Sequence, residues 1–90
     1  MPYAASYSEE LTEKLVKIKR KYRKMYDTIL KKIDEILQNP EHYKPLRHDM
    51  HTLRRVHIFG SFVLVFKIEE STKTVKFMDF DHHDKIYKKR

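Results

Sequence analysis

The sequence contains no cysteine, a single glycine, and no apolar segment long enough to cross a membrane. Without cysteine the chain can form neither a disulfide bond nor a thiolate metal site, which suits a reducing compartment. The longest apolar run covers residues 62–66, whereas a membrane-spanning helix needs about 20 apolar residues. The first residues do not resemble a signal peptide. We therefore expect a soluble, cytoplasmic protein without membrane contacts.

The size of the chain limits the core that it can form. Its 90 residues are 40% apolar and 37% charged, so we expect one small domain over residues 1–90 with a modest hydrophobic core. A domain without disulfides or metal can gain stability from a bound partner. No glycine-rich phosphate loop or other cofactor motif occurs, and we expect no cofactor and no metal.

Positive charge dominates the chain. The net charge is +7, which favours a polyanionic or acidic partner, either nucleic acid or an acidic protein. A solvated helix face is the alternative explanation for one basic cluster. Two such clusters at distant positions favour a surface that binds a phosphate backbone. They consist of Lys17, Lys19, Arg20, Lys21, Arg23 and Lys24, and of Lys85, Lys88, Lys89 and Arg90.

Helical periodicity covers the first half of the chain. Tyr3 to Tyr7 alternate weakly and predict a short strand, after which Ser8 can cap a helix that begins at Glu9. Apolar residues then recur every three or four positions up to Asn39. One helix of that length would measure roughly 45 Å, so we expect two helices with a break between residues 19 and 24.

The second half has the periodicity of strands. Residues 52–59 and 62–68 flank Gly60, which permits a tight hairpin turn, and residues 74–80 form a third strand. Residues 62–66 are apolar on both faces, as expected for a central strand covered by helices. The predicted fold is α+β: an N-terminal strand, a two-helix hairpin, and a three-strand antiparallel meander with the helices packed on one face of the sheet.

Three histidines near the ends of predicted strands are candidates for proton transfer. His57 shares a strand face with Arg55, while Arg54 belongs to the other face. His82 and His83 follow the third strand, and only one of them should share a surface with His57. The spacing does not select between them.

Several roles are open to these histidines. A single histidine often has a structural role, which we expect for His42, His48 and His51. A metal site would use His57, one histidine of the pair and Asp84, although no His-x3-His spacing supports it. The third possibility is acid–base chemistry on RNA.

Metal-independent RNA cleavage needs a base near the 2′-hydroxyl, a cation at the phosphate and an acid at the leaving oxygen. The chain offers candidates for each part, with Tyr87 available to stack on a base or donate a proton. His57, His82, His83 and Lys44 can exchange protons, and Arg47, Arg54 and Arg55 can bind phosphate.

Four segments carry a resemblance to a known family. They are Asn39-Pro40, Lys44-Pro45-Leu46-Arg47, residues 55–67 and residues 82–87. Together they resemble the RelE/ParE superfamily of type II toxins, and the order of elements over nearly the whole chain is similar. The resemblance implies a toxin that cleaves mRNA in the ribosomal A site and is silenced by an acidic antitoxin; some members poison DNA gyrase instead.

The residues match the histidine-using, YafQ-like members best. His57, Gly60 and Phe62 fit the motif of that group, with Ser61 in place of an acid, Lys44 in place of an upstream histidine, and Val63 where many other members have arginine. We therefore expect a ribosome-dependent mRNA interferase, an endoribonuclease that inhibits translation. A ParE-like gyrase inhibitor or an inactive RNA- or protein-binding member is the alternative.

Overall fold

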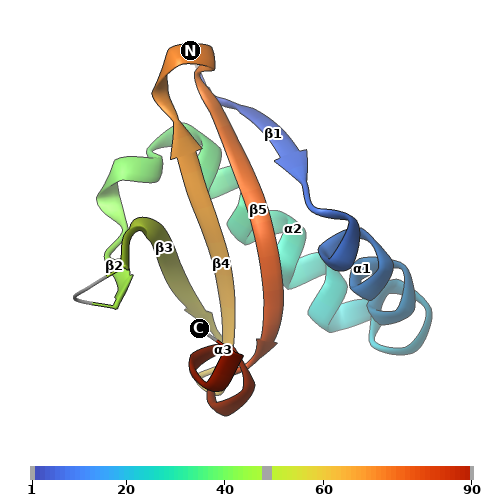
Figure 1. Cartoon of the computed structure of the whole chain (residues 1–90). Coiled ribbons are helices and arrows are strands. Elements are labelled where there is room, and N and C mark those ends of the chain that lie inside the picture. Colours follow the sequence, from blue (N-terminus) through green and yellow to red (C-terminus); the bar gives the residue numbers. More distant parts are fainter. Residues whose placement is uncertain (1, 48–49, 90) are drawn as a thin grey trace.

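The computed structural model describes residues 2–47 and 50–89, in which two long helices cover one face of a five-stranded sheet and a short helix covers the other (Figure 1). His48 and Arg90 lie outside the described residues. The elements are β1 (Ala4–Tyr7), α1 (Glu9–Lys21), α2 (Arg23–Gln38), the 3₁₀ turn η1 (Pro40–His42), β2 (Pro45–Arg47), β3 (Met50–Ile58), β4 (Phe62–Glu69), the 3₁₀ turn η2 (Glu70–Thr72), β5 (Thr74–His82) and α3 (His83–Lys89).

Ser8 starts the helical layer as predicted. Its Oγ accepts the backbone N–H of Leu11 at 3.0 Å and donates to the carbonyl of Met78 on β5 at 2.5 Å. One side chain therefore caps α1 and ties it to the sheet. The predicted break is confirmed at Tyr22, where φ is −134° and ψ is 67°.

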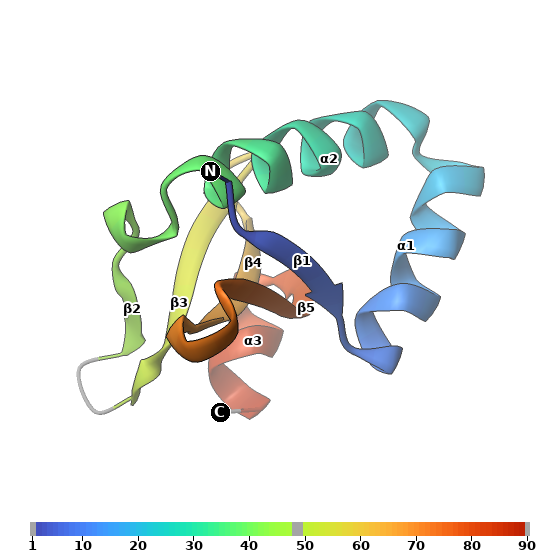
Figure 2. The same cartoon turned by 90° about the horizontal axis from the view of Figure 1, so that it is seen from above.

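The sheet has the strand order β1-β5-β4-β3-β2, with β1 parallel to β5 and the remaining pairs antiparallel. The predicted meander of three antiparallel strands is confirmed, with β4 at its centre. Leu64 and Phe66 face the core under α1 and α2, whereas Val63 and Val65 face a second core with Leu46 and Ile86. Figure 2 shows α2 and α3 on opposite sides of the sheet.

The structure corrects the prediction that helices lie on one face only. After β5 the chain forms α3 over His83–Lys89, which buries Ile86 on the second face. The start of α3 carries an unusual cap, in which the backbone N–H of Asp84 donates to Nδ1 of His82 at 3.2 Å. Common capping signals are Ser, Thr, Asp and Asn, so the sequence did not predict this helix.

The segment Pro45–Arg47 forms a short strand at the edge of the sheet. It pairs with β3 through an irregular register. Proline is tolerated there because an edge strand need not donate every backbone N–H to a neighbour.

A three-residue loop joins β3 to β4 and contains strained backbone. Gly60 has the positive φ that was expected of it, 73°, but Phe59 also has a positive φ of 55° and is 54% exposed. Bulky residues rarely adopt this conformation. The loop also holds α3, since the backbone N–H of His83 donates to the carbonyl of Ser61 at 2.7 Å.

The strained backbone at Phe59 predicts that glycine is more stable than alanine at this position, the reverse of their usual order. Glycine usually destabilises a position relative to alanine, but at a positive φ it removes a penalty of roughly 1–2 kcal/mol. Phe59→Gly should therefore be more stable than Phe59→Ala by about 0.5–1 kcal/mol in thermal denaturation. At Ser61, where φ is not positive, Ser61→Gly should be less stable than Ser61→Ala. The same order at both positions would contradict strain at Phe59.

Candidate functional site

Three of the predicted site residues gather on the sheet face opposite α1 and α2. The rings of His57 and His83 are stacked, with centroids 5.9 Å apart and planes inclined by 23°. Tyr87 lies one helical turn after His83, and its ring centroid is 4.7 Å from that of His83. The grouping arises because β4 separates β3 from β5, and α3 turns back from the end of β5 to cover β4.

His82 and His83 separate at the junction of β5 and α3. The ring of His82 meets Phe62 edge-on at 5.8 Å, and Phe62 packs against the core beneath α1 and α2. The structure thus places His83, and not His82, against His57.

Arg54 and Arg55 occupy opposite faces of β3. Nη1 of Arg54 donates to the carbonyls of Tyr43 at 2.6 Å and Glu41 at 3.3 Å, so Arg54 fastens the segment after α2 and does not reach the histidine pair. Arg55 shares the face of His57. Its Nε is buried and has no hydrogen-bond partner within the described part of the chain.

Tyr87 connects α3 to the edge of the sheet. Its hydroxyl donates to the carbonyl of Leu46 at 2.9 Å. Lys44 lies just before that strand, where its carbonyl accepts the backbone N–H of Arg55 at 3.0 Å and its side chain is exposed. The side chains of Arg47, His51 and Lys89 lie outside the described residues.

The environment of His57 favours its neutral form. Partial burial of the imidazole, followed by the positive charge of Arg55 and the proximity of His83, lowers the pKa of His57. Neutral imidazole accepts protons, so His57 is suited to act as a base near neutral pH. Asp84 lies beside the pair, with its Oδ1 3.5 Å from Nδ1 of His83.

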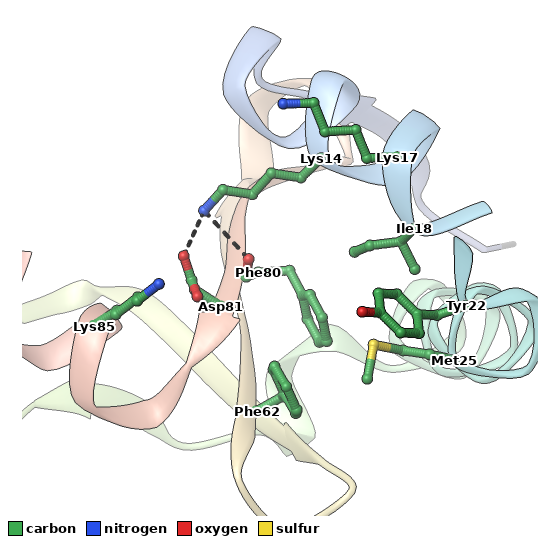
Figure 3. A pocket seen from close by; sticks show the side chains of 9 residues that line it. All are labelled: Lys14, Lys17, Ile18, Tyr22, Met25, Phe62, Phe80, Asp81 and Lys85. Carbon is green, nitrogen blue, oxygen red and sulfur yellow. Dashed lines mark hydrogen bonds and ion pairs between the residues drawn. The ribbon is translucent and has the colours of Figure 1, made fainter. Parts of the chain in front are cut away.

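The two basic clusters meet on the opposite face. Lys17 and Lys85 both line a hollow of about 660 Å³ between α1, the start of α2 and the end of the sheet (Figure 3). Lys14, which the sequence analysis missed, lies at the same hollow and contacts Asp79 at 2.7 Å and Asp81 at 2.9 Å. Its position three residues before Lys17 on a helix was the available signal.

Other members of the first cluster point elsewhere. Lys19 and Arg23 lie over the ring of Tyr26, at 5.7 and 5.9 Å from its centroid. Lys17 also lines a second hollow, about 410 Å³ in volume, together with Arg20 and Lys21. Two further members of the basic clusters, Lys24 on α2 and Lys88 on α3, are exposed.

Among the side chains that the structure describes, no three from histidine, aspartate or glutamate gather as metal ligands do. None of the described helices is long and apolar enough to cross a membrane.

The electrostatic effect of Arg55 on His57 can be measured directly. Arg55→Gln removes a positive charge, so the pKa of His57 should rise toward the ordinary value of about 6.5. NMR titration of the imidazole protons would report the shift. Arg54→Gln, on the opposite face of the same strand, should leave that pKa unchanged. Equal shifts in both variants would show that Arg55 exerts no specific influence.

Comparisons with known proteins agree with this architecture. A sequence model of the ParE toxin of type II toxin–antitoxin systems matches residues 5–87. A candidate toxin of Methanocaldococcus jannaschii designated RelE4 is 51% identical over 88 residues, covering 98% of this chain and 94% of that protein.

Solved structures share the fold. An Escherichia coli RelE toxin variant in the free state has a TM-score of 0.77 at 17% identity, covering 98% of this chain and 93% of the other. The toxin–antitoxin complex RelBE2 of Mycobacterium tuberculosis includes a chain with a TM-score of 0.76 at 19% identity, covering 92% and 93% respectively. The present chain therefore belongs to the RelE/ParE superfamily of type II toxin–antitoxin toxins.

Proposed function

We propose that this toxin is a ribosome-dependent mRNA endonuclease that needs no metal ion and uses the stacked His57–His83 pair for proton transfer. The observation that carries the proposal is the meeting of this pair with Arg55 on one sheet face. Two exchangeable protons and a fixed cation are the requirements of metal-independent RNA cleavage.

In the proposed mechanism His57 acts as the base. It removes the proton of a ribose 2′-hydroxyl, and the resulting oxygen attacks the adjacent phosphorus. Protonated His83 donates a proton to the departing 5′-oxygen. The bond from phosphorus to that oxygen breaks, leaving a 2′,3′-cyclic phosphate and a 5′-hydroxyl.

Arg55 is the proposed phosphate ligand. Arg55 shares the sheet face of His57 and is partly buried. Its guanidinium would donate to a non-bridging phosphate oxygen and neutralise the charge that develops during attack.

Tyr87 is proposed to orient a base rather than to donate a proton. Its hydroxyl hydrogen is already donated to the carbonyl of Leu46. The ring remains beside His83, where an unpaired base can stack on an aromatic face.

The partners follow from the charge and from the family. The complexes of M. tuberculosis RelBE2 and E. coli RelBE contain an antitoxin with the toxin. We propose that this chain, with its net charge of +7, likewise binds an acidic antitoxin and otherwise binds ribosomal RNA through its basic clusters.

Gyrase inhibition without RNA cleavage is the second candidate function. It is favoured by the match to the ParE toxin model and by Val63, which is fully buried beneath α3 at the position where many relatives have arginine. Primer extension on translating mRNA, run beside a DNA supercoiling assay, separates the two functions.

Adjacent histidines provide a matched test of the nuclease mechanism. His83→Ala should reduce cleavage of ribosome-bound mRNA by about 10²-fold or more, as expected for loss of a general acid. His82→Asn should retain the parental rate, because asparagine can replace the cap of α3. Circular dichroism would verify folding of both variants. Full activity of His83→Ala would refute the proton-transfer role.

Ribosome binding should depend steeply on salt. The logarithm of affinity should fall linearly with the logarithm of salt concentration, and Lys17→Gln should reduce the slope by about 1. Lys31→Gln, a charge-matched change on α2 outside the two basic clusters, should leave the slope unchanged. Filter binding across a salt series measures both slopes, and identical slopes for the parent and Lys17→Gln would exclude a phosphate contact at Lys17.

A further inference from the structure

The hollow that joins the two basic clusters lies at the end of the sheet on the side covered by α1 and α2, and neither His57 nor His83 lines it. Phe62 and Phe80, which line it, belong to the edge of the core beneath α1 and α2. The proposed nuclease mechanism makes no use of this hollow. Its volume of about 660 Å³ falls within the range of roughly 300–1,000 Å³ typical of small-molecule sites.

The apolar walls of the hollow present aromatic faces. Tyr22 stands at the break between α1 and α2 and is 62% exposed. Figure 3 shows its ring beside Ile18 and Met25, across the hollow from Phe62 and Phe80. Phe62 and Phe80 are themselves stacked at 5.4 Å. A flat aromatic ligand can contact Tyr22 on one side and Phe62 on the other.

The cations at the hollow are not equivalent. Lys14 is held by Asp79 and Asp81, and although burial opposes its charge, these carboxylates raise the pKa of Lys14. Lys17 and Lys85, by contrast, form no hydrogen bond or ion pair with the described residues. Both side chains line the hollow, and the ammonium group of Lys17 points away from its aromatic rings (Figure 3). Two ammonium groups thus remain available for an anionic ligand.

Asp81 adds a hydrogen-bond acceptor. One carboxylate oxygen contacts Lys14 at 2.9 Å, and the other accepts the backbone N–H of His82 at 2.8 Å. Each oxygen has a second lone pair. Carboxylates accept hydrogen bonds from the amino groups of bases, so Asp81 favours a base with an exocyclic amine over uracil.

We propose that this hollow binds one unpaired base of single-stranded RNA, with the base between Tyr22 and Phe62 and the flanking phosphates at Lys17 and Lys85. The inference goes beyond cleavage, because it concerns a second RNA contact on the other face of the sheet. It depends on RNA as a ligand of the toxin, but not on the histidine chemistry.

The shape of the hollow favours a base over a peptide helix. A docked helix requires a long trough along an element, whereas these lining residues converge from α1, α2, β4, β5 and α3 on one place. Stacking on aromatic side chains together with cations along the backbone is the usual recognition of single-stranded RNA.

The absence of tryptophan from the chain permits a direct test. Tyr22→Trp introduces one indole at the hollow, and a 2′-O-methyl hexanucleotide cannot be cleaved through its 2′-oxygen. This oligonucleotide should quench the fluorescence saturably, with tighter binding for adenine, cytosine or guanine than for uracil. Inorganic polyphosphate, which carries charge without bases, should cause little quenching. In Tyr7→Trp, which places the indole next to Phe77 instead, the oligonucleotide should cause little quenching.

A second variant distinguishes stacking from charge. Tyr22→Ala should weaken oligonucleotide binding about 10-fold, in line with the loss of one base–aromatic stack, while polyphosphate affinity stays unchanged. Tyr22→Phe should bind like the parent. The exposure of Tyr22 makes unfolding by these changes unexpected, and circular dichroism verifies this.

Three results would overturn the base site. They are parental oligonucleotide affinity in Tyr22→Ala, equal quenching of Tyr22→Trp by oligonucleotide and polyphosphate, and a fluorescence change caused only by an acidic amphipathic peptide. Failure of the nuclease proposal would be seen separately, as intact mRNA on the ribosome while the Tyr22→Trp quenching persists.

Discussion

The burial of β4 on both faces is the constraint on which the rest of the structure depends. Val63 to Phe66 are all fully buried, so each side of this strand must be covered. The long amphipathic helices cover one side and α3 covers the other. At roughly 1.5–3 kcal/mol for each large apolar side chain removed from water, neither cover can be lost without exposing half of a small core.

Placement of the candidate catalytic groups follows from that packing. α3 is held over the sheet by Ile86, by the bond from Tyr87 to Leu46 and by the bond from His83 to Ser61. The same contacts bring the ring of His83 to that of His57. The residues that complete the second core thus also determine the geometry of the histidine pair, and substitutions in that core would disturb both.

The sequence predicted those features that depend on local periodicity. The capped start of α1, the hairpin at Gly60 and the central position of β4 each show a signal within a few residues, whereas the break between the helices was expected from the length of the helical pattern. No local pattern predicted α3. A histidine ring caps this helix, and the burial of Ile86 depends on tertiary contacts with Leu46, Val63 and Val65. Alternation along a strand predicted that only one of His82 and His83 shares a surface with His57. Which of the two does so depends on where α3 begins. The hollow at Lys17 and Lys85 joins distant segments and leaves no local pattern.

The parallel pairing of β1 with β5 determines how late in synthesis the chain can complete its folding. Ala4 pairs with Thr74, and Tyr7 with Phe77, so the first strand has no partner until nearly the whole polypeptide has been synthesised. Helical segments form from local contacts, whereas such long-range strand pairs form late. A chain interrupted before β5 would leave the apolar stripe of its helices uncovered, which favours aggregation and proteolysis. Truncated translation products would then be cleared by the cell instead of accumulating as partially active toxin.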